Sequence, residues 1–136
     1  MDIKELSKKY LQYTIDMRRE FHMFPEASMH EVRTSQRIKE ELEKMGIPCV
    51  TMAGTGVVAE IKGKKEGKTI ALRADIDALE MTEKRDVPYK SKNEGLMHAC
   101  GHDSHAAMLL GAAKVFNEIK DELNGTVKLM FSREKK

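Results

Sequence analysis

The sequence lacks the features that place a protein in a membrane or outside the cell. Its longest apolar stretches, residues 108–113 and 69–72, fall far short of the roughly 20 residues that span a bilayer. Residues 1–9 are charged and contain no apolar signal-peptide core. Only two cysteines occur, Cys49 and Cys100, and one distant pair is no disulfide framework. We therefore expect no membrane partner and a reduced, cytoplasmic location, with Cys49 as a small buried hydrophobic residue.

An excess of charge of one sign is also missing. The 24 Lys and Arg residues face 22 Asp and Glu residues, and the two signs interleave along the chain. Such a pattern offers no basic face for a phosphate backbone, so nucleic acid is an unexpected partner. With 136 residues, 40% hydrophobic and 34% charged, the chain fits one folding unit or a part of one, and it shows no internal repeat.

Two amphipathic helices are predicted near the amino terminus. Large apolar residues recur every three to four positions over residues 3–24, which is the spacing of a helix with one buried face. A second apolar stripe covers residues 32–45. Ser28 and Glu31 resemble a capping box in front of it, and Gly46 supplies a stop behind it.

The middle of the chain changes to short strand-like runs. Three such runs are residues 47–52, 56–62 and 69–74. The polar, glycine-flanked segment 63–68 predicts a hairpin between the second and third runs. Asn124-Gly125 predicts a turn before a last strand, residues 126–131, which we expect at an unpaired edge of a half-built sheet with exposed apolar surface.

A third helix and a long loop complete the prediction. Small and apolar residues dominate 104–119, with Asp103 or Ser104 as the expected N-cap. Residues 75–97 show no clean period and read as a loop, and loops of this length are often functional. The order of elements predicts an α/β fold, a layered sheet with flanking helices.

One short segment gathers residues that can bind a metal. Residues 97–105 hold three of the five histidines and one of the two cysteines, and thiolate and imidazole are both ligands of divalent transition metals. On a helix, Cys100 and His102 would point about 200° apart, so they can share one ion only in a loop or turn, which Gly101 permits. From the spacing alone, a metal site and ordinary residues at a helix start both remain open.

Two further features favour the metal site. A helix of small, apolar residues begins directly after the cluster and would hold it rigidly. The strand at 69–74 ends in Asp75-Ile76-Asp77, at the carboxyl end of a strand, where sheets of this class place their sites. A carboxylate that orients a ligand imidazole is the usual arrangement around such metals.

Three stretches carry a resemblance to a known family. They are residues 18–26 (RREFHMFPE), residues 70–79 (IALRADIDAL) and residues 97–105 (MHACGHDSH). In this order they resemble the hippurate-hydrolase and auxin-conjugate-hydrolase branch of the N-acyl-amino-acid amidohydrolases, within the aminoacylase and carboxypeptidase G type dinuclear metallopeptidases. The likeness runs from about residue 10 to residue 131.

The resemblance implies a zinc-peptidase-like catalytic domain that hydrolyses the amide bond of small N-acyl amino acids or peptides with two divalent ions. Zinc or manganese is expected, with cobalt as a third candidate. Cys100 matches the ligand between the two ions, His102 matches a terminal ligand, and Asp77 matches the catalytic carboxylate that orients the site. Asp75 is the less certain carboxylate, because neighbouring branches have a histidine ligand there. His22 resembles a structural element.

The sequence departs from the family after Phe131. Relatives continue with Gln-Pro-Ala-Glu-Glu, whose first Glu is the general base and whose second is a metal ligand, whereas this chain reads Ser-Arg-Glu-Lys-Lys and places Lys135 and Lys136 at the acidic positions. Two cations there would invert the electrostatics of the site. Glu134 is one position early, and on a strand it would face the other side.

We therefore expect residues 1–136 to form the incomplete amino-terminal part of the catalytic domain, without the later histidine ligands and without the dimerisation and substrate-lid domain. Such a chain would be inactive alone, and a homodimer is expected only of full-length relatives. Two alternatives remain. One is a non-catalytic metal-binding module that uses Cys100 and His102, with His98 or His105, which we otherwise place outside the ligand set. The other is a fragment that pairs with a separately encoded remainder.

Overall fold

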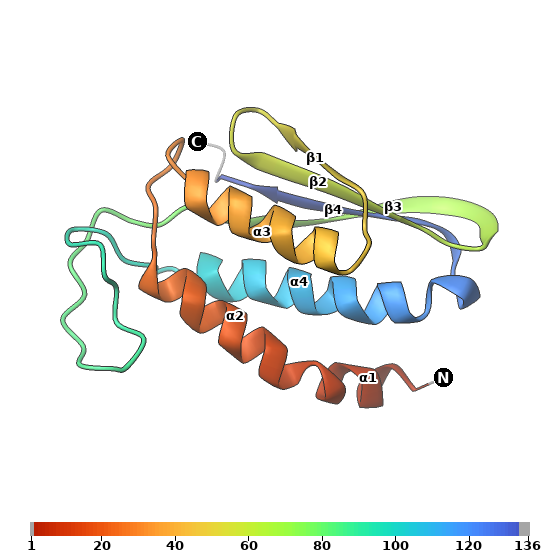
Figure 1. The fold of residues 1–136 in the computed structure, drawn as a ribbon, viewed down its shortest axis with the longest axis horizontal. Helices are drawn as coiled ribbons and strands as arrows, with labels where there is room; N and C mark the ends of the chain where they lie inside the picture. The colour runs from red at the N-terminus through yellow and green to blue at the C-terminus, as the bar shows by residue number, and fades with distance from the viewer. Residues whose placement is uncertain (1, 134–136) are drawn as a thin grey trace.

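Helices cover one face of a four-stranded sheet in the computed structural model, which describes residues 2–133 (Figure 1). The elements are α1 (Ile3–Lys9), α2 (Leu11–Met23), α3 (Val32–Lys44), β1 (Cys49–Met52), β2 (Gly56–Lys62), β3 (Lys65–Asp75), α4 (His102–Glu118), the 3₁₀ helix η1 (Lys120–Glu122) and β4 (Asn124–Ser132). Helices α3 and α4 lie against the sheet, and α2 packs along α4. Within the described residues no helix covers the opposite face. The predicted layered α/β fold is confirmed.

The strand order is β1-β2-β4-β3, which differs from the predicted pairing. The expected hairpin between residues 56–62 and 69–74 is wrong, because β4 lies between β2 and β3, antiparallel to the former and parallel to the latter. The expectation that the last strand lies at an edge is wrong for the same reason. The side chains of β4 that face the helices explain its central place. Val127, Leu129 and Phe131 are buried, and a strand whose side chains are buried in this way needs a neighbouring strand on each side. The hairpin that does form joins β1 to β2.

The Asn124-Gly125 pair begins β4 and is not the predicted turn. The turn before this strand is made by η1. Gly125 has a φ of 104°, and a Cβ there would lie 2.1 Å from the carbonyl oxygen of Lys68. Glycine is therefore required at this point because the backbones of β3 and β4 approach too closely for any side chain.

The helix ends also differ in detail from the predictions. The single helix expected over residues 3–24 is interrupted at Tyr10 and ends at Met23. The expected capping box of Ser28 and Glu31 does not form.

Instead, the carboxylate of Glu26 accepts hydrogen bonds from the backbone N–H of Thr34 at 2.6 Å and of Arg33 at 3.1 Å. A negative side chain thereby satisfies free N–H groups in the first turn of α3. The predicted stop at Gly46 is confirmed, because this residue follows α3 with a φ of 76°.

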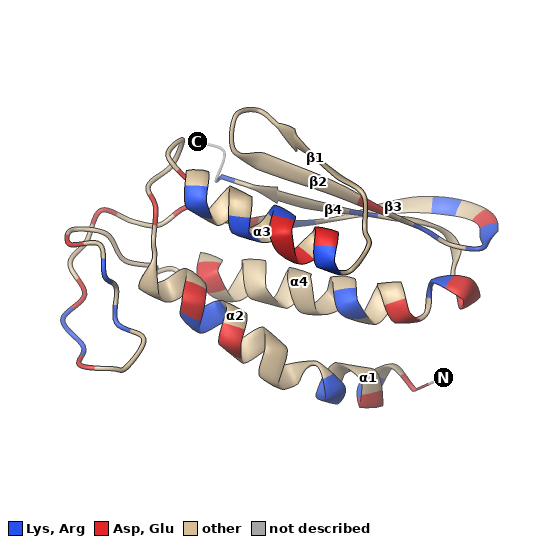
Figure 2. Ribbon diagram, in the orientation of Figure 1, with Lys and Arg blue, Asp and Glu red and all other residues tan. Residues whose placement is uncertain are grey.

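The hydrophobic core lies between the sheet and helices α2, α3 and α4. Its largest fully buried apolar side chains are Phe21, Ile38, Leu42, Ile76, Leu110, Leu129 and Phe131. Cys49 is only partly buried, against the edge of this core, so the expectation of a fully buried thiol holds in part. Lys, Arg, Asp and Glu alternate over the helices and the turns, so the interleaving of charge in the sequence persists in the fold (Figure 2). No helix in residues 2–133 is long and apolar enough to cross a bilayer.

A network of charged residues fastens α2 to α3. The carboxylate of Glu41 is almost wholly buried and accepts hydrogen bonds from Tyr13 Oη at 2.8 Å, Arg37 at 2.6 Å and Lys44 at 3.2 Å. Burial acts to raise the pKa of Glu41, but the hydrogen bonds from these three partners outweigh it and lower the pKa below the ordinary 4.5.

Replacing Glu41 by glutamine should make unfolding less sensitive to acid. Because the folded-state pKa of Glu41 is lowered, its stabilising contribution is present above about pH 4.5 and is lost as the pH falls through the folded value. The difference in unfolding free energy between wild type and Glu41→Gln should therefore be largest near neutral pH and shrink below pH 4.5. Urea unfolding across this range measures it, with the half-exposed Glu40→Gln on the same helix as control. A difference that stays constant with pH would contradict the account.

Candidate metal centre

Helix α4 begins inside the cluster of metal-binding residues. Its first residue is His102 and its N-cap is Gly101, with a φ of 113°, so the predicted cap at Asp103 or Ser104 is wrong. The left-handed backbone at Gly101 turns the chain sharply between Cys100, which is exposed at the end of the preceding loop, and His102, which is buried. The chain therefore forms a turn between Cys100 and His102, which is the condition under which these two residues could share one ion.

The imidazole of His102 is fixed by the segment that follows β3. Its Nδ1 lies 2.9 Å from the backbone oxygen of Asp77 and 3.2 Å from the Oδ1 of the same residue. A carbonyl oxygen can only accept, so Nδ1 carries the proton in this contact and the lone pair resides on Nε2. This is how a protein prepares a histidine for a metal: one nitrogen is held by an oxygen and the other is left to coordinate.

Two carboxylates flank this imidazole, as the position of the DID motif indicated. Asp75 ends β3, and its Oδ2 lies 3.6 Å from Nε2 of His102, beyond hydrogen-bonding distance. Its Oδ1 forms an ion pair with Arg73 at 2.8 Å. Asp77 is buried, whereas Asp75 is partly exposed. The structure therefore brings together Asp75, Asp77 and His102, while Cys100, two residues before His102, is exposed at the surface.

The described residues fit part of a metal site and not a whole one. One observation favours a metal site. The Nδ1 of His102 is held by Asp77, and its Nε2 has a carboxylate oxygen of Asp75 nearby, so an imidazole nitrogen and a carboxylate oxygen, which both suit zinc or manganese, lie close together. Against completeness, no group of three or more His, Cys, Asp or Glu side chains within residues 2–133 is arranged to hold an ion. Lys135 and Lys136, which occupy the acidic positions of the family, lie outside the described residues, and so does Glu134.

His98 is a buried histidine with unused nitrogens. Only 5% of its surface is exposed, and neither ring nitrogen has a hydrogen-bond partner within residues 2–133. Burial lowers the pKa of His98 to about 4, although the nearby charge of Asp103 acts in the opposite direction. The ring is therefore neutral at neutral pH. His105 stacks at a tilt on His102, with 6.0 Å between ring centroids.

The RREFHMFPE motif contains a fully buried histidine, His22. The His22 ring lies between two carboxylates, with Nδ1 2.9 Å from Asp103 Oδ2 and Nε2 2.9 Å from Glu83 Oε2. Burial acts to raise the pKa of Glu83, but its hydrogen bonds with His22 and with the N–H of Ser91 outweigh this and lower it. The reading of His22 as a structural element thus gains definite partners, all of them protein groups.

Sequence reasoning missed both partners of His22. Asp103 was interpreted only as a helix cap, and Glu83 stands in a loop without any pattern. These partners lie 81 and 61 residues away from His22 in the chain, so no local sequence pattern indicates either contact.

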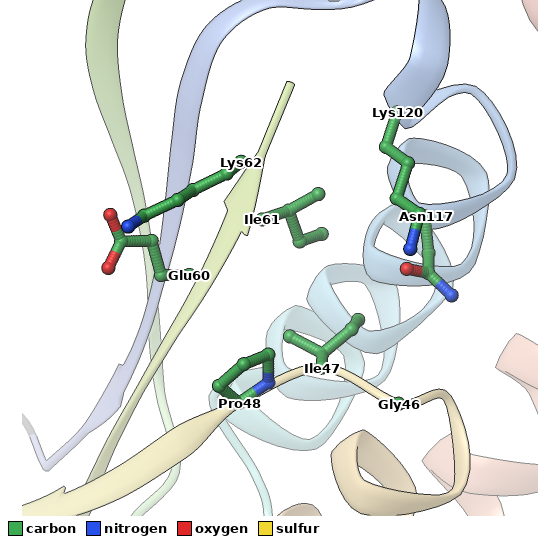
Figure 3. Close-up of a pocket in the computed structure, with 8 residues that line it drawn as sticks. All are labelled: Gly46, Ile47, Pro48, Glu60, Ile61, Lys62, Asn117 and Lys120. Carbon is green, nitrogen blue, oxygen red and sulfur yellow. The ribbon is translucent and has the colours of Figure 1, made fainter. Parts of the chain in front are cut away.

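The hollow drawn in Figure 3 is not part of this site. It has a volume of about 350 Å³ and is lined by residues around Pro48, Lys62 and Lys120. The hollow lies beside the carboxyl end of α4, where Asn117 lines it, whereas His102 begins that helix, and 17 helical residues span roughly 25 Å.

Several known proteins are similar to this chain in sequence. The model of peptidase family M20/M25/M40 matches residues 71–134, which include the DID and HACGHD segments. A thermostable carboxypeptidase of Saccharolobus solfataricus is 45% identical, covering 96% of this chain and 33% of its own length. An N-acetylcysteine deacetylase of Bacillus subtilis is 48% identical, over 86% of this chain and 31% of its own.

A solved structure shares the fold as well as the sequence. The Bacillus subtilis YXEP protein, described as a dinuclear metal binding peptidase from the M20 family, superposes with a TM-score of 0.87 at 45% identity. The match covers 91% of this chain and 35% of that protein. The chain thus spans about a third of the length of its relatives. By sequence and by fold it is a relative of the metal-dependent amidohydrolases and peptidases of family M20/M25/M40.

Proposed function

We propose that this chain is the metal-binding segment of a hydrolase that cleaves the amide bond of N-acyl amino acids. The observation that carries the proposal is His102, held at Nδ1 by Asp77 with Nε2 beyond hydrogen-bonding distance of Asp75, in a segment that matches the family model. The relatives support the reaction class: one is named a deacetylase of an N-acyl amino acid and another a carboxypeptidase, and both act on amide bonds.

The roles of the residues follow from their positions. Cys100 and His102 would hold a divalent ion, with the thiolate contributing negative charge and the imidazole a neutral nitrogen. When bound, such an ion lowers the pKa of a water and polarises the amide carbonyl. Asp77 would keep the His102 ring in one tautomer and orientation. Asp75, 3.6 Å from Nε2, adds a carboxylate at the same point.

We further propose that the 136-residue chain does not hydrolyse amides by itself. The described residues supply two expected ligands and two carboxylates, and no arrangement of three donors that would fix an ion is found among residues 2–133. Amide hydrolysis also needs a base that takes a proton from water and delivers it to the leaving nitrogen. Asp77 is engaged with His102, so it is poorly placed for that second task.

A complementing role is the second candidate, and the uncovered sheet face favours it. Val50 and Met52 are more than half exposed on the edge strand β1. Beside them an open hollow of about 840 Å³ is lined by Met29, by apolar residues of β2 and β4, and by polar residues that include Arg73 and Arg133. An apolar surface of this kind in a small domain is typical of contact with more polypeptide. The occupant we propose is a polypeptide equivalent to the remaining two thirds of the relatives.

A chimeric enzyme tests the proposed function. Residues 1–131 of this chain, which end before its departure from the family, replace the matching part of the Bacillus subtilis N-acetylcysteine deacetylase, and hydrolysis of N-acetylcysteine is measured with added zinc or manganese. We expect activity from the chimera and none above the metal-only blank from the isolated chain. Asp77→Asn in the chimera should lower kcat/KM by about 10- to 100-fold, because it removes a carboxylate that orients a ligand.

The controls separate the alternatives. Asp86→Asn, on the exposed part of the same loop, should leave the chimera's activity unchanged. Activity recovered when the chain and the remaining two thirds are co-expressed as separate polypeptides would support the complementing role. A folded chimera that retains full activity with Asp77→Asn would contradict the assigned site, and turnover by the isolated chain would refute its inactivity.

A further inference from the structure

We propose that His22 is a positioning residue for His102, acting through Asp103. The inference rests on the proposed metal-binding role of His102 but concerns a different part of the molecule. His22 lies in the last turn of α2, Asp103 lies in the first turn of α4, and the two helices meet at this contact.

The first turn of α4 has no side-chain cap of its own. Its N-cap is Gly101, which has no side chain to satisfy the free N–H groups. Asp103 takes over this task in part, because its Oδ1 accepts a hydrogen bond from the N–H of Ser104 at 2.9 Å. Its Oδ2 faces α2, where Arg18 Nε donates at 2.9 Å and His22 Nδ1 lies at 2.9 Å. The turn that carries His102 is therefore fastened to α2 by one carboxylate.

Burial makes this fastening rigid. His22 is 0% exposed and Asp103 is 1% exposed, so water cannot replace either partner. A buried carboxylate that loses its partners is strongly destabilising, so displacement of the turn is opposed. Since His102 immediately precedes Asp103 in the chain, its Cα moves with Asp103.

The other nitrogen of His22 fastens the long loop. Glu83 Oε2 lies 2.9 Å from Nε2, and its Oε1 accepts the N–H of Ser91 at 2.7 Å. The Tyr89 ring meets the His22 ring edge to face, with 5.7 Å between centroids. The loop is further tied to α2 where the N–H of Lys92 donates to the carbonyl oxygen of Met23. This link holds the outer loop, whereas the link to Asp103 holds the turn that begins with His102.

The two links can be separated by substitution. The side-chain amide of asparagine reaches the position of an imidazole Nδ1, and that of glutamine reaches the position of Nε2. His22→Asn therefore keeps the contact with Asp103 and loses Glu83, and His22→Gln does the reverse. A merely structural role predicts that both variants affect His102 in proportion to their loss of stability. A positioning role through Asp103 predicts that only the glutamine variant disturbs His102.

The first measurement needs no metal. Imidazole nitrogen NMR of the 136-residue chain at neutral pH reports which nitrogen of His102 carries the proton. We expect the Nδ1–H form in wild type, because that nitrogen donates to the carbonyl oxygen of Asp77. His22→Asn should keep this spectrum, and His22→Gln should give a mixture of both tautomers. Cobalt titration of the same samples should show about tenfold weaker binding for the glutamine variant alone.

A second pair of variants keeps the proposal testable where the His22 variants unfold. Asp103→Ala removes the link to α4 and should give the mixed tautomers, and Glu83→Ala removes the link to the loop and should not. His102 signals that stay unchanged in Asp103→Ala, or that change equally in both, would overturn the positioning role. The predicted tautomer pattern without cobalt binding by wild type would instead leave this inference standing and refute the proposed metal site.

Discussion

Replacing Leu110 with alanine is expected to lower the free energy of unfolding by about 3–5 kcal/mol. Leu110 is fully buried on α4, the helix that packs against both α2 and the sheet. Truncation removes its transfer free energy and leaves a cavity between these layers, which cannot close because the strands below are fixed by their hydrogen bonds. Domains of this size are stable by roughly 5–15 kcal/mol, so the loss is a large share of the total.

Met108 supplies the matched control on the same helix. Its side chain is 55% exposed, so Met108→Ala should change the unfolding free energy by less than about 0.5 kcal/mol. Urea unfolding followed by circular dichroism measures both variants, with the slope against urea compared to confirm that the same structure unfolds. Equal losses in the two variants would show that α4 does not pack on the sheet as described.

Periodicity predicted the elements of this fold better than their pairing. The apolar stripe of α3 and the stop at Gly46 are visible in the sequence because helix geometry is local. The position of β4 between β2 and β3 is not, because a parallel pair is joined across α4 and no turn signal marks it. The glycine-flanked segment 63–68 therefore led to the wrong prediction of a hairpin between β2 and β3.

The cap of α3 illustrates the same limit on a smaller scale. Ser28 and Glu31 have the spacing of a capping box, yet the N–H groups are satisfied by Glu26, which the chain brings back from before the helix. Glu31 is directed instead to Thr55, whose hydroxyl donates to it at 2.8 Å. A sequence pattern indicates that the first N–H groups of a helix need hydrogen-bond acceptors, but it does not indicate which residue outside the helix supplies them.

The candidate site was predictable where its residues are close along the chain. The turn between Cys100 and His102 follows from their spacing and from Gly101, and the DID segment was expected at the end of a strand. The support around the site was not predictable, because Glu83 and Asp103 meet His22 only in the folded chain. Candidate metal ligands can be recognised in a sequence by residue type, whereas the residues that position them are found only from contacts in the folded chain.

Replacing Cys100 with serine is expected to weaken cobalt binding to the chain by about a hundredfold or more. Loss of an outer partner of a metal ligand typically costs 10- to 100-fold in affinity, and loss of a thiolate ligand itself costs more. A thiolate bound to cobalt also gives a sulfur-to-metal charge-transfer absorption in the near ultraviolet, and a hydroxyl does not. Cys49→Ser is the matched control, because Cys49 is partly buried in β1 and burial raises the pKa of its thiol.

Cobalt titration of wild type, Cys100→Ser and Cys49→Ser, followed by this absorption, is the most direct measurement of whether Cys100 and His102 share a divalent ion. We predict that the band appears in wild type and in Cys49→Ser, is absent in Cys100→Ser, and is weakened in His102→Ala. A band that survives in Cys100→Ser, or that depends on Cys49, would contradict the proposed metal centre.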